Sequence, residues 1–155
     1  MSENIQFSIQ SLISTRKFMH DFMSNYSYEQ LTKIPEGFSN SMLWNFGHAV
    51  VVQQLLTYGL SGNEVHLEKS IIHLFKKGAT GKEVVSEDEF NSLKIKSLEL
   101  TKRLSSDYNE ISKTPYSPFM TGLNIELNSV DDAIEFNNVH EALHFGVMLS
   151  ISKLV

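Results

Sequence analysis

The chain has 155 residues, of which 41% are hydrophobic and 20% charged, and this length and composition fit one globular domain spanning 1–155. The net charge of −5 provides no basic face, so we do not expect nucleic acid as a partner. The absence of cysteine excludes disulfides, a cysteine nucleophile and a cysteine-type zinc site.

Four segments repeat apolar residues at alternating steps of three and four, a spacing typical of the inward faces of bundled helices. The pattern predicts helices near 3–24, 39–60, 87–112 and 130–153. Ser86 with Glu89 forms a capping box at the start of the third helix, and Ser129 caps the fourth. We therefore expect an all-α four-helix bundle without a sheet beyond a short bridge.

The connections between these helices are less regular. Residues 27–34 predict a short helix ended by Pro35, and 61–85 predicts another near 67–77. A further irregular stretch, 114–128, contains two prolines and a glycine. Loops of this length in a compact domain are often lids or binding surfaces.

Nothing in the sequence predicts a membrane or secreted protein. The most apolar stretch, 42–60, also contains Asn45, His48 and two glutamines, which makes it too polar for a lipid-exposed span. The N-terminal residues show no basic segment followed by an apolar run. We expect a cytoplasmic protein without a membrane partner.

Three histidines occupy inward positions where apolar residues are the rule. His140 and His144 are four residues apart, so both leave the same face of one helix about 6 Å apart along its axis. His48 lies on the inward face of another helix. The three are either hydrogen-bonded core residues or ligands of one divalent ion with a fourth position open to a substrate. The sequence does not show whether the two helices are neighbours.

The string HEALH at 140–144 also matches the HExxH motif of zinc proteases, whose glutamate acts as the general base. Glu141, however, is turned about 100° from His140 around the helix axis. We expect it to face a neighbouring helix, to support a ligand from behind or to face solvent. Because both histidines face inward and no sheet is predicted, we do not interpret the motif as that of a protease.

The run WNFGH at 44–48, followed by VVQQLL at 51–56, and the late HEALHFG at 140–146 resemble the DinB-like (YfiT-like) superfamily. The resemblance covers about residues 5–153. It implies an up-down-down-up four-helix bundle. It also implies a divalent ion held by His48, His140 and His144.

Members of this superfamily with known activity are mostly transferases or isomerases that use a low-molecular-weight thiol such as bacillithiol, mycothiol or glutathione. The resemblance therefore implies a metal-dependent transferase of this kind. The alternative is a non-catalytic metal-binding or structural bundle with a role in a stress response. Three imidazoles suit Zn, Ni, Cu and Fe alike, so the metal is not distinguished.

A thiol-dependent enzyme also needs a site for the anionic groups of the thiol. Arg16 is the sole basic residue on an inward helix face and is the first candidate; alternatively it extends to the end of the bundle. Lys76, Lys77 and Lys82 on the long connection are a second set, although surface lysines are usually only solvated.

Other polar and aromatic residues lie close to the histidines in the helical pattern. Asn45 and Asn137 each precede a histidine by about one turn and either line the pocket, orient a ligand or satisfy helix polar groups. Trp44 is expected to pack the bundle. His66 and His73 lack a third partner and are expected on the surface.

Ten phenylalanines and six methionines are more apolar side chain than one small core needs. Phe136, Val139 and Leu143 lie beside the main inward face of the last helix. We expect them to pack against a second copy of the chain, which predicts a homodimer.

Overall fold

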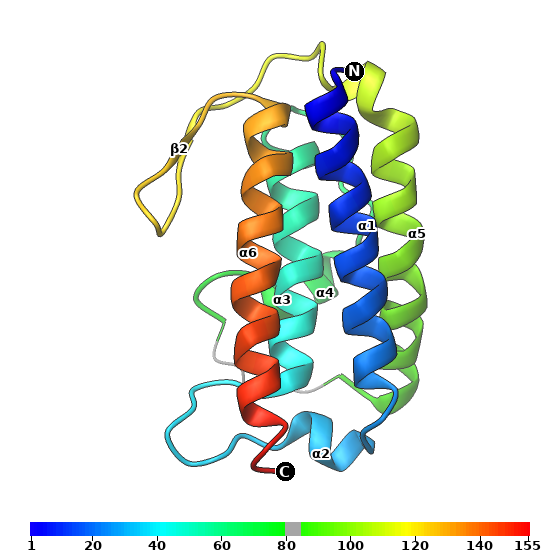
Figure 1. The fold of residues 1–155 in the computed structure, drawn as a ribbon, viewed down its shortest axis with the longest axis vertical. Helices are drawn as coiled ribbons and strands as arrows, with labels where there is room; N and C mark the ends of the chain where they lie inside the picture. The colour runs from blue at the N-terminus through cyan, green and yellow to red at the C-terminus, as the bar shows by residue number, and fades with distance from the viewer. Residues whose placement is uncertain (80–84) are drawn as a thin grey trace.

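Four long helices lie side by side in the computed structural model, which describes residues 1–79 and 85–155 (Figure 1). They are α1 (Glu3–Met23), α3 (Met42–Gln54), α5 (Glu87–Ile111) and α6 (Val130–Ile151). In the view of Figure 1 the chain descends along α1 and α6 and ascends along α3 and α5. The predicted all-α fold is confirmed.

A serine begins each long helix. Its side chain accepts a hydrogen bond from a backbone N–H of the first turn, which satisfies one of the donors that a helix start leaves unpaired. These serines are Ser2, Ser41, Ser86 and Ser129. The predicted capping box of Ser86 with Glu89 is confirmed, as is the cap at Ser129.

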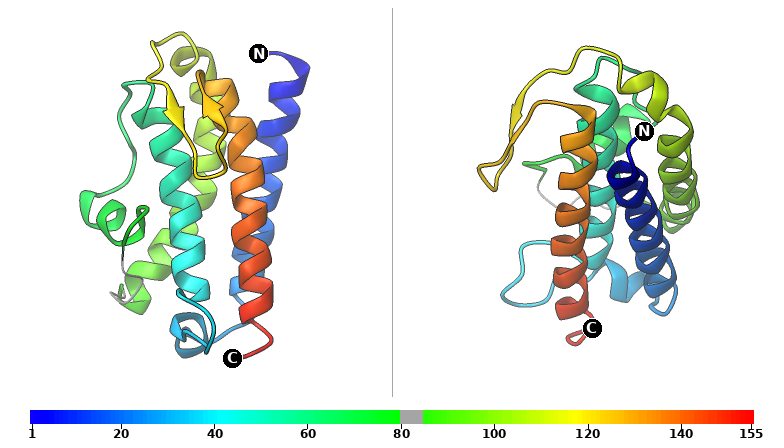
Figure 2. Two further views of the ribbon diagram at one scale, coloured as in Figure 1. Left: turned by 90° about the vertical axis from the view of Figure 1, so that its left-hand side faces the viewer. Right: turned by 45° about the horizontal axis from the view of Figure 1, so that its top comes forward.

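The shorter elements occupy the connections. Helix α2 (Tyr28–Thr32) begins at a second capping box, and α4 (Lys69–Phe75) lies within the range that the sequence predicts. Strands β1 (Phe119–Met120) and β2 (Glu126–Leu127) pair antiparallel as a small hairpin. Figure 2 (left) shows this hairpin lying across the upper halves of α3 and α6.

A π-helical turn, η1 (Leu55–Gly59), extends α3 where the sequence predicts an unbroken α-helix to residue 60. The N–H of Leu60 donates to the carbonyl of Leu55, five residues back, at 3.0 Å. Such turns occur often at functional sites. This one contributes Leu55, Leu56 and Gly59 to the wall of a cavity.

Helix α3 forms the centre of the fold. All of its residues except Val52 are buried, because α6 packs along one side and the shorter α2 and α4 cover others. Helix α6 packs against both α3 and α1, and α5 completes the bundle on the far side of α1 (Figure 1). The two helices that carry the three histidines are therefore neighbours.

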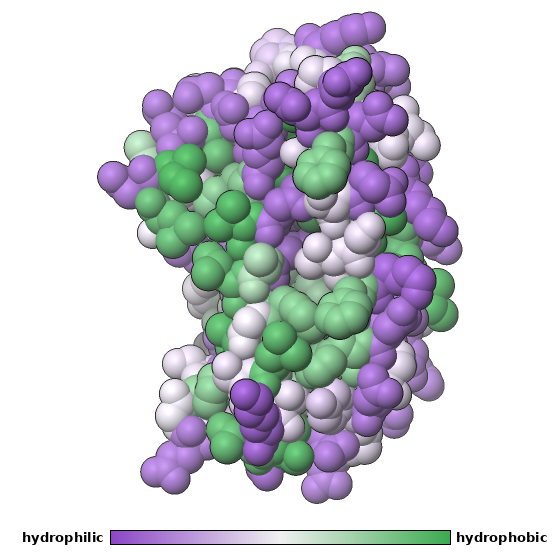
Figure 3. Space-filling view, viewed as in Figure 1, coloured by the Kyte–Doolittle hydropathy of each residue, from purple (hydrophilic) through white to green (hydrophobic). Residues whose placement is uncertain are grey.

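The surface shows exposed apolar side chains on α1, on α6 and around the hairpin (Figure 3). Val139 and Leu143 are about half exposed, as a dimer face requires, but Phe136 is only 8% exposed and lies in a cavity wall. Phe136 is therefore not available to a second subunit, and the homodimer stays a prediction. Within the described residues, no helix is both long enough and apolar enough to cross a bilayer.

Candidate metal centre

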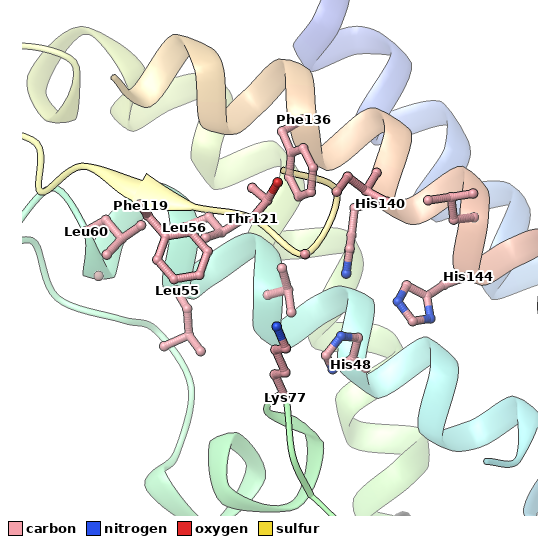
Figure 4. Close-up of a pocket in the computed structure, with 15 residues that line it drawn as sticks. His48, Leu55, Leu56, Leu60, Lys77, Phe119, Thr121, Phe136, His140 and His144 are labelled. Carbon is pink, nitrogen blue, oxygen red and sulfur yellow. The ribbon is translucent and has the colours of Figure 1, made fainter. Parts of the chain in front are cut away.

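The rings of His48, His140 and His144 converge between α3 and α6 (Figure 4). One nitrogen from each ring can be chosen so that all three lie within 4.8 Å of one another. The ring centroids are 4.5–5.2 Å apart. Three imidazoles at these separations are a donor set that one divalent ion could share.

Hydrogen bonds behind two of the rings fix which nitrogen faces the cluster. His48 Nδ1 lies 2.6 Å from the carbonyl oxygen of Phe75, and because a carbonyl only accepts, Nδ1 must carry the hydrogen. His144 Nδ1 lies 2.8 Å from Asn45 Oδ1, while the amide nitrogen of Asn45 donates to the carbonyl of Ser41. Both rings therefore keep the lone pair on Nε2, the arrangement found in metal-bound histidines.

The third ring has no such partner. Nδ1 of His140 is buried and makes no hydrogen bond within the described residues. Burial, together with the nearby His144, His48 and Arg16, lowers the pKa of His140 to about 3. Burial also lowers the pKa of His144 to about 4, and that of His48 below its usual value. All three rings are thus neutral at pH 7, the form that coordinates a metal, and the residues present fit a divalent ion.

Gly47 allows the contact that orients His48. A Cβ atom at this position would lie 2.5–2.7 Å from three ring atoms of Phe75, closer than carbon atoms can approach. Glycine therefore lets α4 pack directly on α3, which places the Phe75 carbonyl against His48. The sequence identified Gly47 only as part of a family pattern. Its partner is 28 positions away, so no local signal reveals it.

A cavity of about 740 Å³ adjoins the three rings. The histidines occupy one end, and residues of η1, α6 and the hairpin form the other walls together with Leu60, which follows η1; Phe119 and Phe136 are among them (Figure 4). Lys77 also lines it. The cluster is thus open on one side, as a catalytic rather than a structural metal site would be.

A family model described as the DinB superfamily matches residues 11–148, which is most of the chain. The chain belongs to the DinB superfamily. No curated protein matches it. The family match and the three-histidine cluster together fit a metal-binding protein.

The sequence suggested that Arg16 either binds an anion beside the site or extends to the end of the bundle. In this DinB protein it lies elsewhere. Its guanidinium is completely buried and pairs with the equally buried carboxylate of Glu141, with Nε 3.2 Å from Oε2. A second guanidinium nitrogen donates to the carbonyl of Ser97. Arg16 is therefore not among the residues that line the cavity and does not extend to the end of the bundle, and its role as an anion site stays a prediction.

Glu141 faces a neighbouring helix, one of the three orientations that the sequence allowed. Complete burial raises the pKa of its carboxyl, while the charge of Arg16 and their hydrogen bonds act against this rise. Because both carboxylate oxygens bind Arg16, Glu141 is not placed to act as a base beside the histidines. The geometry thus agrees with rejecting the protease motif.

The structure gives the remaining polar candidates for the site different positions. Asn45 orients His144 but does not line the cavity, whereas Asn137 is fully buried, donates to the carbonyl of Ala133 and leaves its Oδ1 without a partner in the described residues. Lys76 does not line the cavity, and Lys82 lies outside the described residues.

Trp44 packs within the core, as expected, and its ring stacks on His48 at 4.6 Å between centroids. His73 is exposed, also as expected, and His66 is half-buried against Tyr58. In the described part of the chain, neither histidine joins a metal-binding group.

Proposed function

We propose that this protein is a divalent-metal-dependent enzyme that transfers a low-molecular-weight thiol to a second substrate. His48, His140 and His144 would hold the ion. The observation that carries the proposal is the position of three neutral imidazoles at the end of a 740 Å³ cavity instead of within a closed core. Such a site leaves a coordination position accessible to a substrate.

A bound divalent ion would lower the pKa of a thiol or of water, so that a nucleophile exists at neutral pH. The chain has no cysteine, so the thiol would come from outside. A hydrolytic reaction would also need a general base, but no carboxylate among the described residues lines the cavity, and Glu141 is bound to Arg16. The thiol reaction is therefore favoured over hydrolysis.

The roles of the chain's own residues follow from their contacts. Asn45 and the Phe75 carbonyl hold two rings with Nε2 toward the cluster. Leucine and phenylalanine side chains form most of the cavity walls and offer water few hydrogen-bond partners. With Arg16 bound to Glu141, Lys77 is the cation among the described lining residues that an anionic group of a substrate would meet.

The test is thiol conjugation by the metal-loaded protein. Glutathione, bacillithiol and mycothiol are each incubated with monochlorobimane, an apolar electrophile whose conjugate fluoresces, and zinc, nickel and iron are each tried. We expect conjugation above the uncatalysed rate with at least one thiol, and its loss in His144→Ala. A protein that binds the ion but accelerates none of these reactions would contradict the transferase proposal and favour the non-catalytic alternative.

A further inference from the structure

The walls of the cavity are mostly hydrocarbon. Of the fifteen lining residues in the described part of the chain, eight are aliphatic or aromatic and none carries a carboxylate. Its volume of about 740 Å³ lies in the range of pockets that enclose a drug-sized molecule. Water in such a cavity finds few hydrogen-bond partners, so a ligand with an apolar body is favoured.

The polar groups of the cavity are not evenly spread. Figure 4 shows the three imidazoles at one end, with Leu60 and Phe119 at the other. Lys77 extends into the space near His48 from the segment that follows α4. Among the described residues, Lys77 is the only charged side chain in the lining.

The Lys77 side chain lines the cavity and approaches the turn of the hairpin at Gly122. Its Nζ is 3.8 Å from the position that a Cβ atom on Gly122 would occupy. It makes no ion pair with a carboxylate within residues 1–79 and 85–155.

The wall opposite the histidines is anchored to the bundle. The N–H of Ser117 donates to the carbonyl of Leu60 at 2.7 Å, and the hydroxyl of Tyr116 donates to the carbonyl of Leu56 at 3.0 Å. Leu127, in the second strand of the hairpin, is almost completely buried. These contacts fix the wall of the cavity against the segment that follows α3.

We infer that this cavity binds an amphiphilic monoanion, a molecule with an aliphatic or aromatic body and one carboxylate that pairs with Lys77 beside the histidines. Lys77, the one charged side chain among the described lining residues, is exposed to solvent and can pair with one carboxylate, whereas a second charge against the apolar walls would have no partner. The inference rests on the proposed function in one respect, that the acceptor of the thiol would be such a molecule with an electrophilic double bond, to which sulfur adds as the π bond breaks and the thiol proton goes to the neighbouring carbon.

The experiment measures binding of octanoate to the metal-free protein by titration calorimetry. Octan-1-ol is the uncharged ligand of nearly the same shape. Lys77→Met removes the charge and keeps the length of the side chain, and Lys76→Met is the matched control on an exposed neighbour outside the cavity. We expect saturable binding of octanoate that is tighter than that of octan-1-ol. Lys77→Met should weaken octanoate about tenfold or more, the scale of one charge-assisted hydrogen bond, and leave octan-1-ol unchanged.

Three results would overturn the inference: no saturable binding of octanoate, equal binding of octanoate and octan-1-ol, or equal octanoate affinity of Lys77→Met and Lys76→Met. Metal content is measured on parallel samples of each variant equilibrated with the ion, and should be identical in the two lysine variants. Because the titration requires neither ion nor thiol, its failure is distinguishable from failure of the proposed function, which would appear as absent metal or absent conjugation.

Discussion

Consecutive residues of α6 face two different environments. Glu141 packs toward α1, where both oxygens bind Arg16 and neither side chain reaches solvent. His140 faces α3 and the cavity, and its buried Nδ1 has no partner among the described residues. The first polar group is satisfied within the chain and the second is not. Satisfied polar groups serve the fold, whereas unsatisfied groups beside a cavity indicate a ligand.

The buried Arg16–Glu141 pair between α1 and α6 should give the largest effect on stability. A buried ion pair adds little to stability compared with apolar residues of the same size, but removal of one partner leaves a buried charge unpaired. We expect Glu141→Ala to lower the free energy of unfolding by about 3–5 kcal/mol, as measured by urea denaturation of the metal-free protein. The double variant Arg16→Met with Glu141→Met should lose far less. Equal losses in the two variants would show that the pair itself, rather than the orphaned charge, holds the helices together.

His140 and His144, which face the cavity, should make the stability of the metal-free protein sensitive to acid. The pKa values of His140 and His144 are lowered by burial to about 3 and about 4, so the unfolded chain binds their protons more readily than the folded one. The two histidines do not change the stability well above pH 6.5. As the pH falls below that value they lower the free energy of unfolding, by about 1–2 kcal/mol each at pH 5. We expect the free energy of unfolding, measured by urea denaturation, to fall less between pH 7.5 and pH 5.0 for His140→Leu than for the unsubstituted protein. An equal fall in the free energy of unfolding for both proteins would contradict the conclusion that the rings are buried and neutral.

Loss of the hydrogen bond between Asn45 and His144 should lower the affinity for the metal and leave the fold intact. Asn45→Ala removes the acceptor that fixes the His144 ring. Loss of such an outer partner typically reduces metal affinity about 10–100-fold. A competition titration with a chelating dye would measure this. The matched control is Asn137→Ala, whose side chain is buried on α6 but makes no hydrogen bond to a histidine. If both variants bind the ion alike, Asn45 does not orient the site.

Two glycines next to the histidine motifs should respond in opposite ways. Gly47→Ala brings a methyl group into the Phe75 ring, so we expect lower stability and weaker metal binding. Gly146→Ala meets nothing within 4 Å, and alanine in an exposed helical position should raise stability by about 0.5–1 kcal/mol. Thermal denaturation of both variants tests the pair, and a Gly47→Ala protein as stable as Gly146→Ala would contradict the role of the α3–α4 contact.

The sequence predicts most of what is local. The serine caps, the capping box at Ser86 and the inward face that includes His140 and His144 depend on residues within a few positions of one another, and the structure confirms each. Convergence with His48 could be inferred only through the family resemblance, because spacing within one helix does not identify its neighbour.

What escaped prediction depends on packing between distant segments. Arg16 and Glu141 are 125 positions apart, so their pairing requires the register of α1 against α6. The contact of Gly47 with Phe75 requires the angle at which α4 meets α3. The π-helical turn at 55–59 has no signature in its residues, yet it shapes one wall of the cavity.

The most direct test of the account is the metal content of protein purified without an affinity tag, measured by mass spectrometry after equilibration with zinc, nickel or iron. We expect one divalent ion per chain and its loss in His144→Ala, with the helical circular dichroism unchanged. The exposed His73→Ala should retain the ion. A protein that takes up none of these metals, or a His144→Ala variant that binds as much as the unsubstituted chain, would contradict the central claim that His48, His140 and His144 form one metal site.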